Sequence, residues 1–166
     1  KGYIWDQSPG AGGVAFRAST AGDLTTFAYP SGGGGVVLAN SGVSLQTGRW
    51  YHAVSVFETD KVSLYVDGVL SNVTNATIAS VAPVGETDFF IGCSTPPGSE
   101  FMDGRIGAIR IYDRVLTEAQ VFQNYNATKS RYINEAPETA PKIGPAIASD
   151  SNLLLSYDFG NRATYD

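Results

Sequence analysis

The chain has 166 residues, of which 43% are hydrophobic and 11% aromatic, and its 19 glycines are typical of a single domain built from strands and turns. Its formal net charge of −5 provides no electrostatic footprint for nucleic acid or an anionic membrane, and no apolar run approaches the ~18 residues of a membrane span. Cys93 is the only cysteine, which excludes a disulfide within the chain.

Short apolar segments separated by Gly, Pro and Ser residues open the chain. Strands are predicted over residues 3–6, 14–18, 24–29 and 36–38. The four glycines Gly32–Gly35 precede the last of these segments and predict a flexible hairpin tip. They do not indicate a phosphate-binding loop, because no Gly-Lys-Ser/Thr follows them and no helix begins there.

The segment from Gly48 to Gly68 gives the clearest structural signal, that of a β-hairpin. The two faces of its first strand carry Trp50, His52, Val54 and Val56 on one side and Tyr51, Ala53, Ser55 and Phe57 on the other. Lys61–Val66 is the return strand, and Asp67-Gly68 tolerates positive φ at a tight turn, so a further strand is predicted from Val69. Because both faces are apolar, both must be covered, which predicts a sandwich of two antiparallel sheets.

Two more strands are predicted further along, Phe89–Cys93, which is expected to be buried, and Ile106–Tyr112. In a sandwich, apolar side chains from the hairpin and from these strands fill the space between the sheets. The expected core residues are Trp50, Val54, Val56, Leu64, Val66, Ile91, Ile106, Ile109 and Ile111.

A single short helix is predicted after the Ile106–Tyr112 strand. The segment Thr117–Gln120 has the spacing of a capping box, in which the Thr117 hydroxyl accepts a hydrogen bond from the Gln120 amide and the Gln120 side chain reaches back. Val121, Phe122 and Tyr125 form a short apolar stripe. The pattern predicts a helix of one or two turns that leans on the sandwich.

The order of these motifs resembles a known family. Between Gly48 and Tyr125 the chain contains, in this order, the segments GRWYHAV, VSLYVDGVL, FFIG and FMDGRIGAIRIYDRVLTEAQV. Their order and spacing resemble those of the laminin-G-like branch of the concanavalin A-like lectin/glucanase superfamily. The resemblance implies an all-β fold, an antiparallel two-sheet jelly-roll sandwich with one short C-terminal helix. It specifies the fold more than the function, because a jelly roll supports many activities.

The resemblance also implies a division of the chain. Residues 1–132 would form a jelly roll without its first strand, because the family opens with an apolar strand well before this hairpin. The chain itself begins at Lys1, without an initiator methionine or a signal-peptide pattern, and is expected to be a piece of a longer protein. Residues 133–152 carry three prolines among alanines, which predicts an extended linker.

Residues 153–166 resemble the opening strand of the same kind of domain, where an apolar run leads into an Asp-x-Gly-Asn turn. Two explanations remain open. The segment begins a next domain in a tandem array, or it fills the open first-strand position, where it would pair with Ile106–Tyr112. An unpaired strand of this composition would be an aggregation-prone edge.

Catalytic chemistry is not indicated. His52 is the only histidine and lies on an apolar strand face, so we expect a packed structural residue. No Gly-x-Ser-x-Gly motif occurs, and a metal site of histidine and cysteine is excluded by their number. The glutamates Glu58, Glu86, Glu100, Glu118, Glu135 and Glu138 are isolated from one another, whereas a glycosidase needs a carboxylate pair. The chain is therefore expected not to be an enzyme.

No cofactor is predicted, and calcium is kept as an alternative because many related domains bind it through oxygen ligands. The candidate carboxylates are Asp6, Asp60, Asp67, Asp88, Asp103 and Asp113. The family often has an acidic pair on its Arg-Ile-Tyr strand, and this chain has Gly107 and Ala108 there. That departure weakens the expectation of an acidic site on this strand.

Carbohydrate binding is the function that the resemblance implies most directly, and it needs aromatic platforms beside polar groups on exposed loops. Trp5, Tyr29 and Phe101 adjoin polar loops, and Glu100 precedes Phe101. These four residues are the predicted carbohydrate site. The alternative is that the three aromatic residues pack in the core or at sheet edges.

Segments 123–129 and 157–161 resemble the ending and the opening of such domains in tailed-phage structural proteins. We therefore expect a non-enzymatic attachment or structural module of a larger phage or prokaryotic surface protein, on a virion or another extracellular surface. Its expected partners are a glycan or host surface and neighbouring structural subunits, in a homo-oligomer, with no nucleic acid and no membrane. The alternatives are a decoration or fibre domain without a sugar ligand and an accessory lectin domain of a secreted enzyme.

Overall fold

The computed structural model describes residues 2–7, 13–30, 35–78, 89–94 and 100–133, and the backbone of residues 153–158. The described elements are, in chain order, β1 (Gly2–Gln7), β2 (Gly13–Ala18), β3 (Leu24–Tyr29), β4 (Val37–Asn40), β5 (Ala53–Phe57), β6 (Lys61–Val66), β7 (Val69–Asn75), β8 (Phe90–Ile91), β9 (Ala108–Tyr112), α1 (Glu118–Thr128), α2 (Ser130–Ile133) and β10 (Leu153–Asp158).

The N-terminal strands form a five-stranded antiparallel sheet in the order β4-β3-β2-β1-β8. The four strands predicted in this part of the chain are all present, with ends shifted by one or two residues. Most residues of the predicted glycine tip lie outside the described residues. β8 pairs only with β1 and has two residues, so it is a short edge strand and not the buried strand that was predicted.

The predicted hairpin forms the second sheet, β5-β6-β7. Asp67 and Gly68 have φ values of 52° and 80°, so both lie in the left-handed region that a tight two-residue turn requires. The Asp67 carboxylate stabilises the turn by accepting hydrogen bonds from the His52 backbone N–H at 2.9 Å and from the Arg49 guanidinium at 2.9 Å. The turn, the return strand and the strand from Val69 are thus confirmed.

Gly68 also has no room for a side chain, because a Cβ there would lie 2.9 Å from the Tyr125 ring on α1. Gly48 has a similar φ of 81° with open space around it. We expect Gly48→Ala to cost about 1 kcal/mol through φ alone and Gly68→Ala to cost about 2–3 kcal/mol, because overpacking adds to it. Chemical denaturation of both variants measures the difference, and equal losses would contradict the steric argument.

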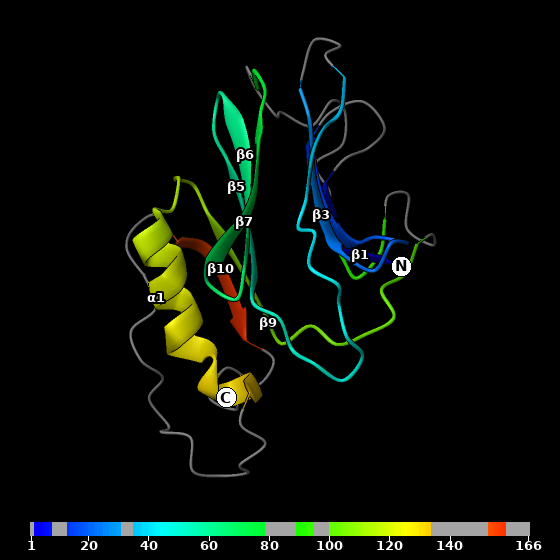
Figure 1. Cartoon of the computed structure of the whole chain (residues 1–166), viewed down its shortest axis with the longest axis vertical. Helices are drawn as coiled ribbons and strands as arrows, with labels where there is room; N and C mark the ends of the chain where they lie inside the picture. The colour runs from blue at the N-terminus through cyan, green and yellow to red at the C-terminus, as the bar shows by residue number, and fades with distance from the viewer. Residues whose placement is uncertain are drawn as a thin grey trace.

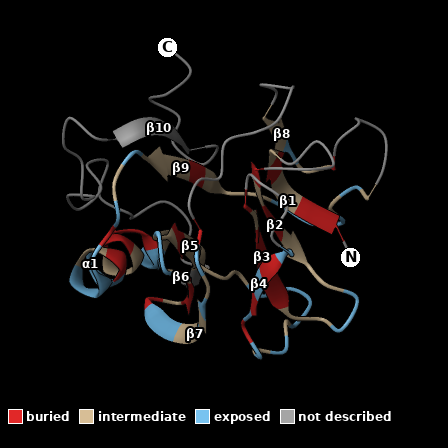
Figure 2. Cartoon of the chain, turned by 90° about the horizontal axis from the view of Figure 1, so that it is seen from above, coloured by how far each residue is buried: buried red, intermediate tan, exposed pale blue. Residues whose placement is uncertain are grey.

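The two sheets face each other, and α1 covers the outer face of the hairpin sheet, so three layers lie side by side (Figure 1). Buried residues concentrate between the layers, whereas β7 and the outer side of α1 are exposed (Figure 2). The main core cluster joins both sheets and comprises Phe16, Leu24, Ala28, Val37, Ala39, Val62, Leu64, Val66 and Ile78. The predicted two-sheet sandwich with both hairpin faces covered is confirmed.

The predicted core is correct in part. Val56, Leu64, Val66 and Ile109 are buried, and Trp50, Val54, Ile106 and Ile111 are half-buried. Ile91 is wrong, because its side chain is 42% exposed. It lies on the edge strand β8, which pairs with β1 on one side and has no other described partner strand.

The capping box of α1 is present as predicted, with the Gln120 N–H donating to Thr117 Oγ1 at 3.3 Å and the Thr117 N–H donating to Gln120 Oε1 at 2.9 Å. The helix has 11 residues, which is longer than the predicted one or two turns, and α2 continues to Ile133. Phe122 was wrongly placed on the buried stripe and is 51% exposed.

The buried positions of α1 are Val121, Asn124, Ala127 and Thr128. Two of them are polar, so an apolar pattern could not reveal them. Thr128 is accommodated because its hydroxyl donates to the Asn124 carbonyl at 2.9 Å, one turn back in the helix.

β10 pairs with β9 in antiparallel register, from Leu153 opposite Tyr112 to Asp158 opposite Ala108. A strand here was expected, and pairing with Ile106–Tyr112 was one of the two explanations left open. The division into a jelly roll, a linker and a terminal segment stays a prediction, and the linker lies almost wholly outside the described residues.

Candidate functional site

A β-bulge in β1 decides which of its side chains reach the outside of the five-stranded sheet. Tyr3 lies opposite Arg17 and Trp5 lies opposite Phe16, so Ile4 is the extra residue between them. A regular strand would place Tyr3 and Trp5 on one face. With the bulge, Ile4 and Trp5 both pack against the core, while Tyr3 and Asp6 lie on the outer face beside Ala15.

Aromatic rings and one guanidinium stack on this outer face. The Arg17 guanidinium lies 4.5 Å from the centre of the Phe27 ring and 5.8 Å from that of Tyr3. The Phe27 ring stacks on Tyr29 at 6.4 Å with an interplanar angle of 18°. Tyr3 and Phe27 are buried, whereas Arg17 and Tyr29 are half-buried. Tyr29 is therefore an accessible ring with a fixed orientation.

The segment that carries Glu100 and Phe101 passes directly over the start of β1. The Tyr3 N–H donates to the Glu100 carbonyl at 3.1 Å. A Cβ at Gly2 would lie 2.3 Å from the Phe101 carbonyl oxygen, so only glycine allows this approach. Glu100 has a φ of 49°, and the Phe101 side chain is 62% exposed.

Burial, the carboxylates of Asp6 and Glu100 and the guanidinium of Arg17 shift the pKa values of Tyr3 and Tyr29. Burial raises the pKa of Tyr29, the carboxylates of Asp6 and Glu100 raise it further, and Arg17 opposes them. Burial likewise raises the pKa of Tyr3, with the same three charged residues contributing. Asp6 is 1% exposed and accepts a hydrogen bond from the Ser94 hydroxyl at 3.0 Å. Both phenols therefore stay protonated at neutral pH and can donate hydrogen bonds.

We call this group the Tyr29 cluster, and it comprises Tyr3, Asp6, Arg17, Phe27, Tyr29 and Glu100. It unites two of the four predicted site residues, Tyr29 and Glu100, and Phe101 is the next residue in the chain. The sequence analysis missed Tyr3, Asp6 and Arg17, because their meeting depends on the bulge.

Trp5 is placed differently from the prediction, which put it beside a polar surface loop. Its ring stacks on Phe89 at 5.6 Å and 21°, and it also contacts Phe16 and Phe57 at centroid distances of 6.4 and 6.5 Å. The bulge is the physical reason, since it turns this side chain into the sandwich.

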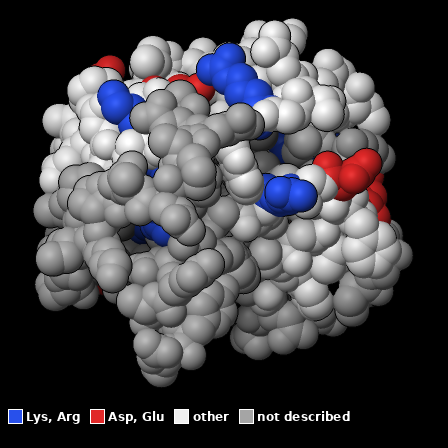
Figure 3. All heavy atoms as spheres, turned by 90° about the horizontal axis from the view of Figure 1, so that it is seen from below, with Lys and Arg blue, Asp and Glu red and all other residues white. Residues whose placement is uncertain are grey.

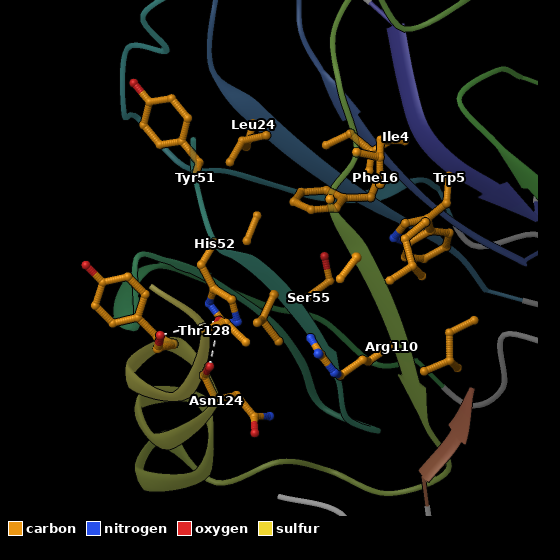
Figure 4. Close-up of a pocket in the computed structure, with 18 of the residues that line it drawn as sticks. Ile4, Trp5, Phe16, Leu24, Tyr51, His52, Ser55, Arg110, Asn124 and Thr128 are labelled. Atoms are coloured by element: carbon orange, nitrogen blue, oxygen red, sulfur yellow. Dashed lines mark hydrogen bonds between the residues drawn. The ribbon is translucent and has the colours of Figure 1, made fainter. Parts of the chain in front are cut away.

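A second feature is a cavity of about 1050 Å³ that extends from the space between the two sheets, past β5 and β9, to α1. One wall is apolar and includes Ile4, Trp5, Phe16 and Leu24 from the five-stranded sheet, as Figure 4 shows. The wall on the α1 side is polar, with His52 before β5, Arg110 from β9, and Asn124 and Thr128 from α1. Ser55 also lines the cavity, from the face of β5 that carries Ala53 and Phe57.

His52 is a buried, neutral member of this cavity. Burial lowers its pKa to about 4, the Arg110 guanidinium acts in the same direction, and the Asp67 carboxylate opposes them. Its ring packs against Tyr125 at 5.8 Å, and its Nδ1 atom is buried without a hydrogen-bond partner among the described residues. This environment fits the packed residue expected from the sequence.

Among the described residues, no three histidine, cysteine or acidic side chains gather in a way that could hold a metal ion. Of the calcium candidates, Asp67 is engaged in its turn, and Asp88 lies outside the described residues. Asp60, Asp103 and Asp113 are exposed.

On the face shown in Figure 3, lysine and arginine side chains lie as separate spots among uncharged atoms. This face has no continuous basic patch among the described residues. No helix in the described part of the chain combines the length and the apolar character needed to cross a membrane.

The fold has relatives among solved structures. A Bacteroides ovatus protein, provisionally described as carbohydrate-binding, is 22% identical with a TM-score of 0.65 over 95% of this chain and 40% of its own. An S-layer domain-containing protein from Clostridium thermocellum is 23% identical with a TM-score of 0.44 over 75% of this chain and 63% of its own. The chain thus spans less than two thirds of either protein, and the first likeness shows the fold alone.

No curated protein matches the sequence significantly. A family model does match, and it covers residues 1–122, which is most of the chain and includes every element of both sandwich sheets up to the start of α1. Together with the antiparallel two-sheet fold, this match shows that the chain belongs to the laminin G 3 family of the concanavalin A-like lectin/glucanases superfamily.

Proposed function

We propose that the Tyr29 cluster binds carbohydrate and that the chain is a non-enzymatic attachment module of a larger extracellular protein. The observation that carries the proposal is the stacked row of Arg17, Phe27 and Tyr29 on the outer face of the five-stranded sheet. Burial raises the pKa of the Tyr29 hydroxyl, and the Glu100 carboxylate acts on it electrostatically in the same direction. These side chains come from β3, β2 and the segment before β9.

The chemistry of the cluster matches what a sugar requires. The apolar C–H face of a pyranose ring packs on an aromatic side chain, and its hydroxyls need donors and acceptors in fixed positions. Stacking on Phe27 fixes the Tyr29 ring. Arg17 supplies N–H donors, the Glu100 carboxylate accepts, and the tyrosine hydroxyl does both. Phe101 follows Glu100 in the chain and is an exposed aromatic residue.

The family and the Bacteroides ovatus structure support this proposal, because that protein is provisionally described as carbohydrate-binding and shares the fold. The acidic net charge and the lack of a disulfide are compatible with a prokaryotic or phage surface protein. We therefore propose that the chain lies on a prokaryotic cell or phage surface and that its partner is a glycan or a host surface.

The test is binding of the full chain to a glycan array, followed by titration of the best ligand. We expect Tyr29→Ala to weaken binding at least tenfold, because it removes the stacking platform. Tyr29→Phe keeps the stack on Phe27 and separates the role of the hydroxyl. Phe122→Ala is the matched control, since Phe122 is an exposed aromatic residue on α1 (51%) and its loss should leave affinity unchanged.

Three outcomes would contradict the proposal. Absence of any bound glycan would favour a structural decoration domain without a sugar ligand. Equal affinity of wild type and Tyr29→Ala for a bound glycan would mean that the sugar site lies outside the Tyr29 cluster. Release of reducing ends from a bound polysaccharide would show that the module is an enzyme.

A further inference from the structure

Two strand edges border the interior cavity. β5 is the outer strand of the sheet β5-β6-β7, and β9 belongs to the separate pair β10-β9. Within the described part of the chain, no strand pairs with the second edge of either. Every residue of β5 and of β9 lines the cavity. The cavity therefore lies between two unpaired sheet edges.

The hydrogen bonds of the hairpin identify the backbone groups on the open edge of β5. The Asp67 N–H donates to the His52 carbonyl at 2.7 Å, and the Glu58 N–H donates to the Lys61 carbonyl at 2.9 Å. Since bonded and non-bonded pairs alternate in an antiparallel ladder, Ala53, Ser55 and Phe57 direct their N–H and C=O groups away from β6.

Three side chains that line the cavity have buried polar atoms without a hydrogen-bond partner among the described residues. The Arg110 side chain extends from β9 toward β5 (Figure 4). Its Nε atom is buried without a hydrogen-bond partner among the described residues, and so are His52 Nδ1 and Ser55 Oγ. Shielded polar atoms are costly unless a hydrogen-bond partner approaches them, and the half-buried Arg110 guanidinium would attract an acidic group.

One kind of occupant satisfies both features. An extended strand in the gap would bond to β5 through one edge and to β9 through the other. Its side chains would point alternately to the apolar wall at Trp5 and Phe16 and to the polar wall at Arg110. The required sequence therefore alternates apolar residues with polar or acidic ones.

We propose that the gap between β5 and β9 accepts residues 153–158 of a second copy of the chain as an added strand. This segment has Leu153, Leu155 and Tyr157 in one alternate set and Leu154, Ser156 and Asp158 in the other. The first set suits the apolar wall, and Ser156 and Asp158 bring a hydroxyl and a carboxylate to Arg110. In the structure this segment pairs in antiparallel register with the other edge of its own β9. Its donation to a second copy therefore exchanges one paired edge for two.

Strand addition of this kind links chains head to tail, because the donated segment and the acceptor gap are different surfaces. It makes the chain a self-assembling module, independently of whether the Tyr29 cluster binds sugar.

The test titrates the full chain with a synthetic peptide of residues 152–160. We expect saturable binding, a rise in the melting temperature and a change in tryptophan fluorescence, because both indoles, of Trp5 and Trp50, line the cavity. Peptides with Asp158→Lys should bind at least tenfold more weakly. Without peptide, the full chain should self-associate with rising concentration in sedimentation experiments.

Two N-methylated peptides locate the binding site. A strand in the gap uses both edges, so N-methylation at Leu155 and N-methylation at Ser156 should each weaken binding at least tenfold. A peptide that only replaces β10 on the outer edge of β9 would be weakened by one of the two modifications.

Chain variants provide an independent check. Ser55→Pro removes the N–H that faces the gap but no bond to β6, so it should abolish peptide binding and self-association. Ser55→Ala keeps this N–H and should retain both. If Ser55→Pro fails to fold, the N-methylated peptides decide the question with the wild-type chain. The proposal is overturned by a chain that neither binds the peptide nor self-associates, by sensitivity to one N-methylation only, or by equal binding of a scrambled peptide.

Discussion

Lowering the pH from 7 to 4 is expected to destabilise the folded chain by roughly 3 kcal/mol through His52 alone. Burial lowers the pKa of His52 to about 4 in the folded chain, with Arg110 acting in the same direction. In the unfolded chain the imidazole titrates near its ordinary value of about 6.5. Between these two pH values the unfolded state binds a proton that the folded state excludes, so stability falls as the pH decreases through this window.

The measurement is the free energy of unfolding as a function of pH for wild type and variants. His52→Gln should reduce the slope between pH 6.5 and 4, while the contributions of the carboxylates remain in both proteins. Arg110→Gln should narrow the pH range over which stability falls. It removes a cation that lowers the pKa of His52 in the folded chain, so that pKa moves toward its value in the unfolded chain. An NMR titration of the folded chain that placed the His52 pKa near 6.5 would contradict this account.

Leu64→Ala is expected to lower the free energy of unfolding by about 2–5 kcal/mol, the range found for large-to-small changes in a packed core. Leu64 is fully buried at the centre of β6 and belongs to the cluster that joins the two sheets. Truncation removes its contacts with that cluster and leaves a space that neighbouring side chains fill only partly.

Leu70→Ala is the matched control, since Leu70 lies on the neighbouring strand β7 and is 40% exposed. It should cost about 1 kcal/mol or less. Urea denaturation of the two variants measures the difference, and equal losses would mean that the space between the sheets is not the main core.

The candidate site could be predicted only in part. Tyr29 and Glu100 were found because each adjoins a polar loop, which is a local property of the sequence. That the Glu100 segment lies beside β1 depends on the Tyr3–Glu100 hydrogen bond and on a glycine at position 2. Neither contact leaves a pattern in the sequence around the residues involved.

Trp5 and Ile91 illustrate the limits of periodicity. An alternating pattern assigns faces correctly only while the strand stays regular, and one extra residue at Ile4 reverses the faces after it. Ile91 is a large apolar residue of the kind found in cores. It lies on β8, at the edge of the five-stranded sheet, and the Ile91 side chain is therefore exposed.

The sequence by itself determined the features that neighbouring residues control. The hairpin β5–β6, the Asp67-Gly68 turn from β6 to β7 and the Thr117–Gln120 cap each rest on side chains and φ preferences within a few positions. The tertiary structure alone decided the bulge, the Tyr29 cluster and the gap between β5 and β9. These arise where segments distant in sequence meet, and strand pairing and packing fix such contacts through interactions that no local pattern records.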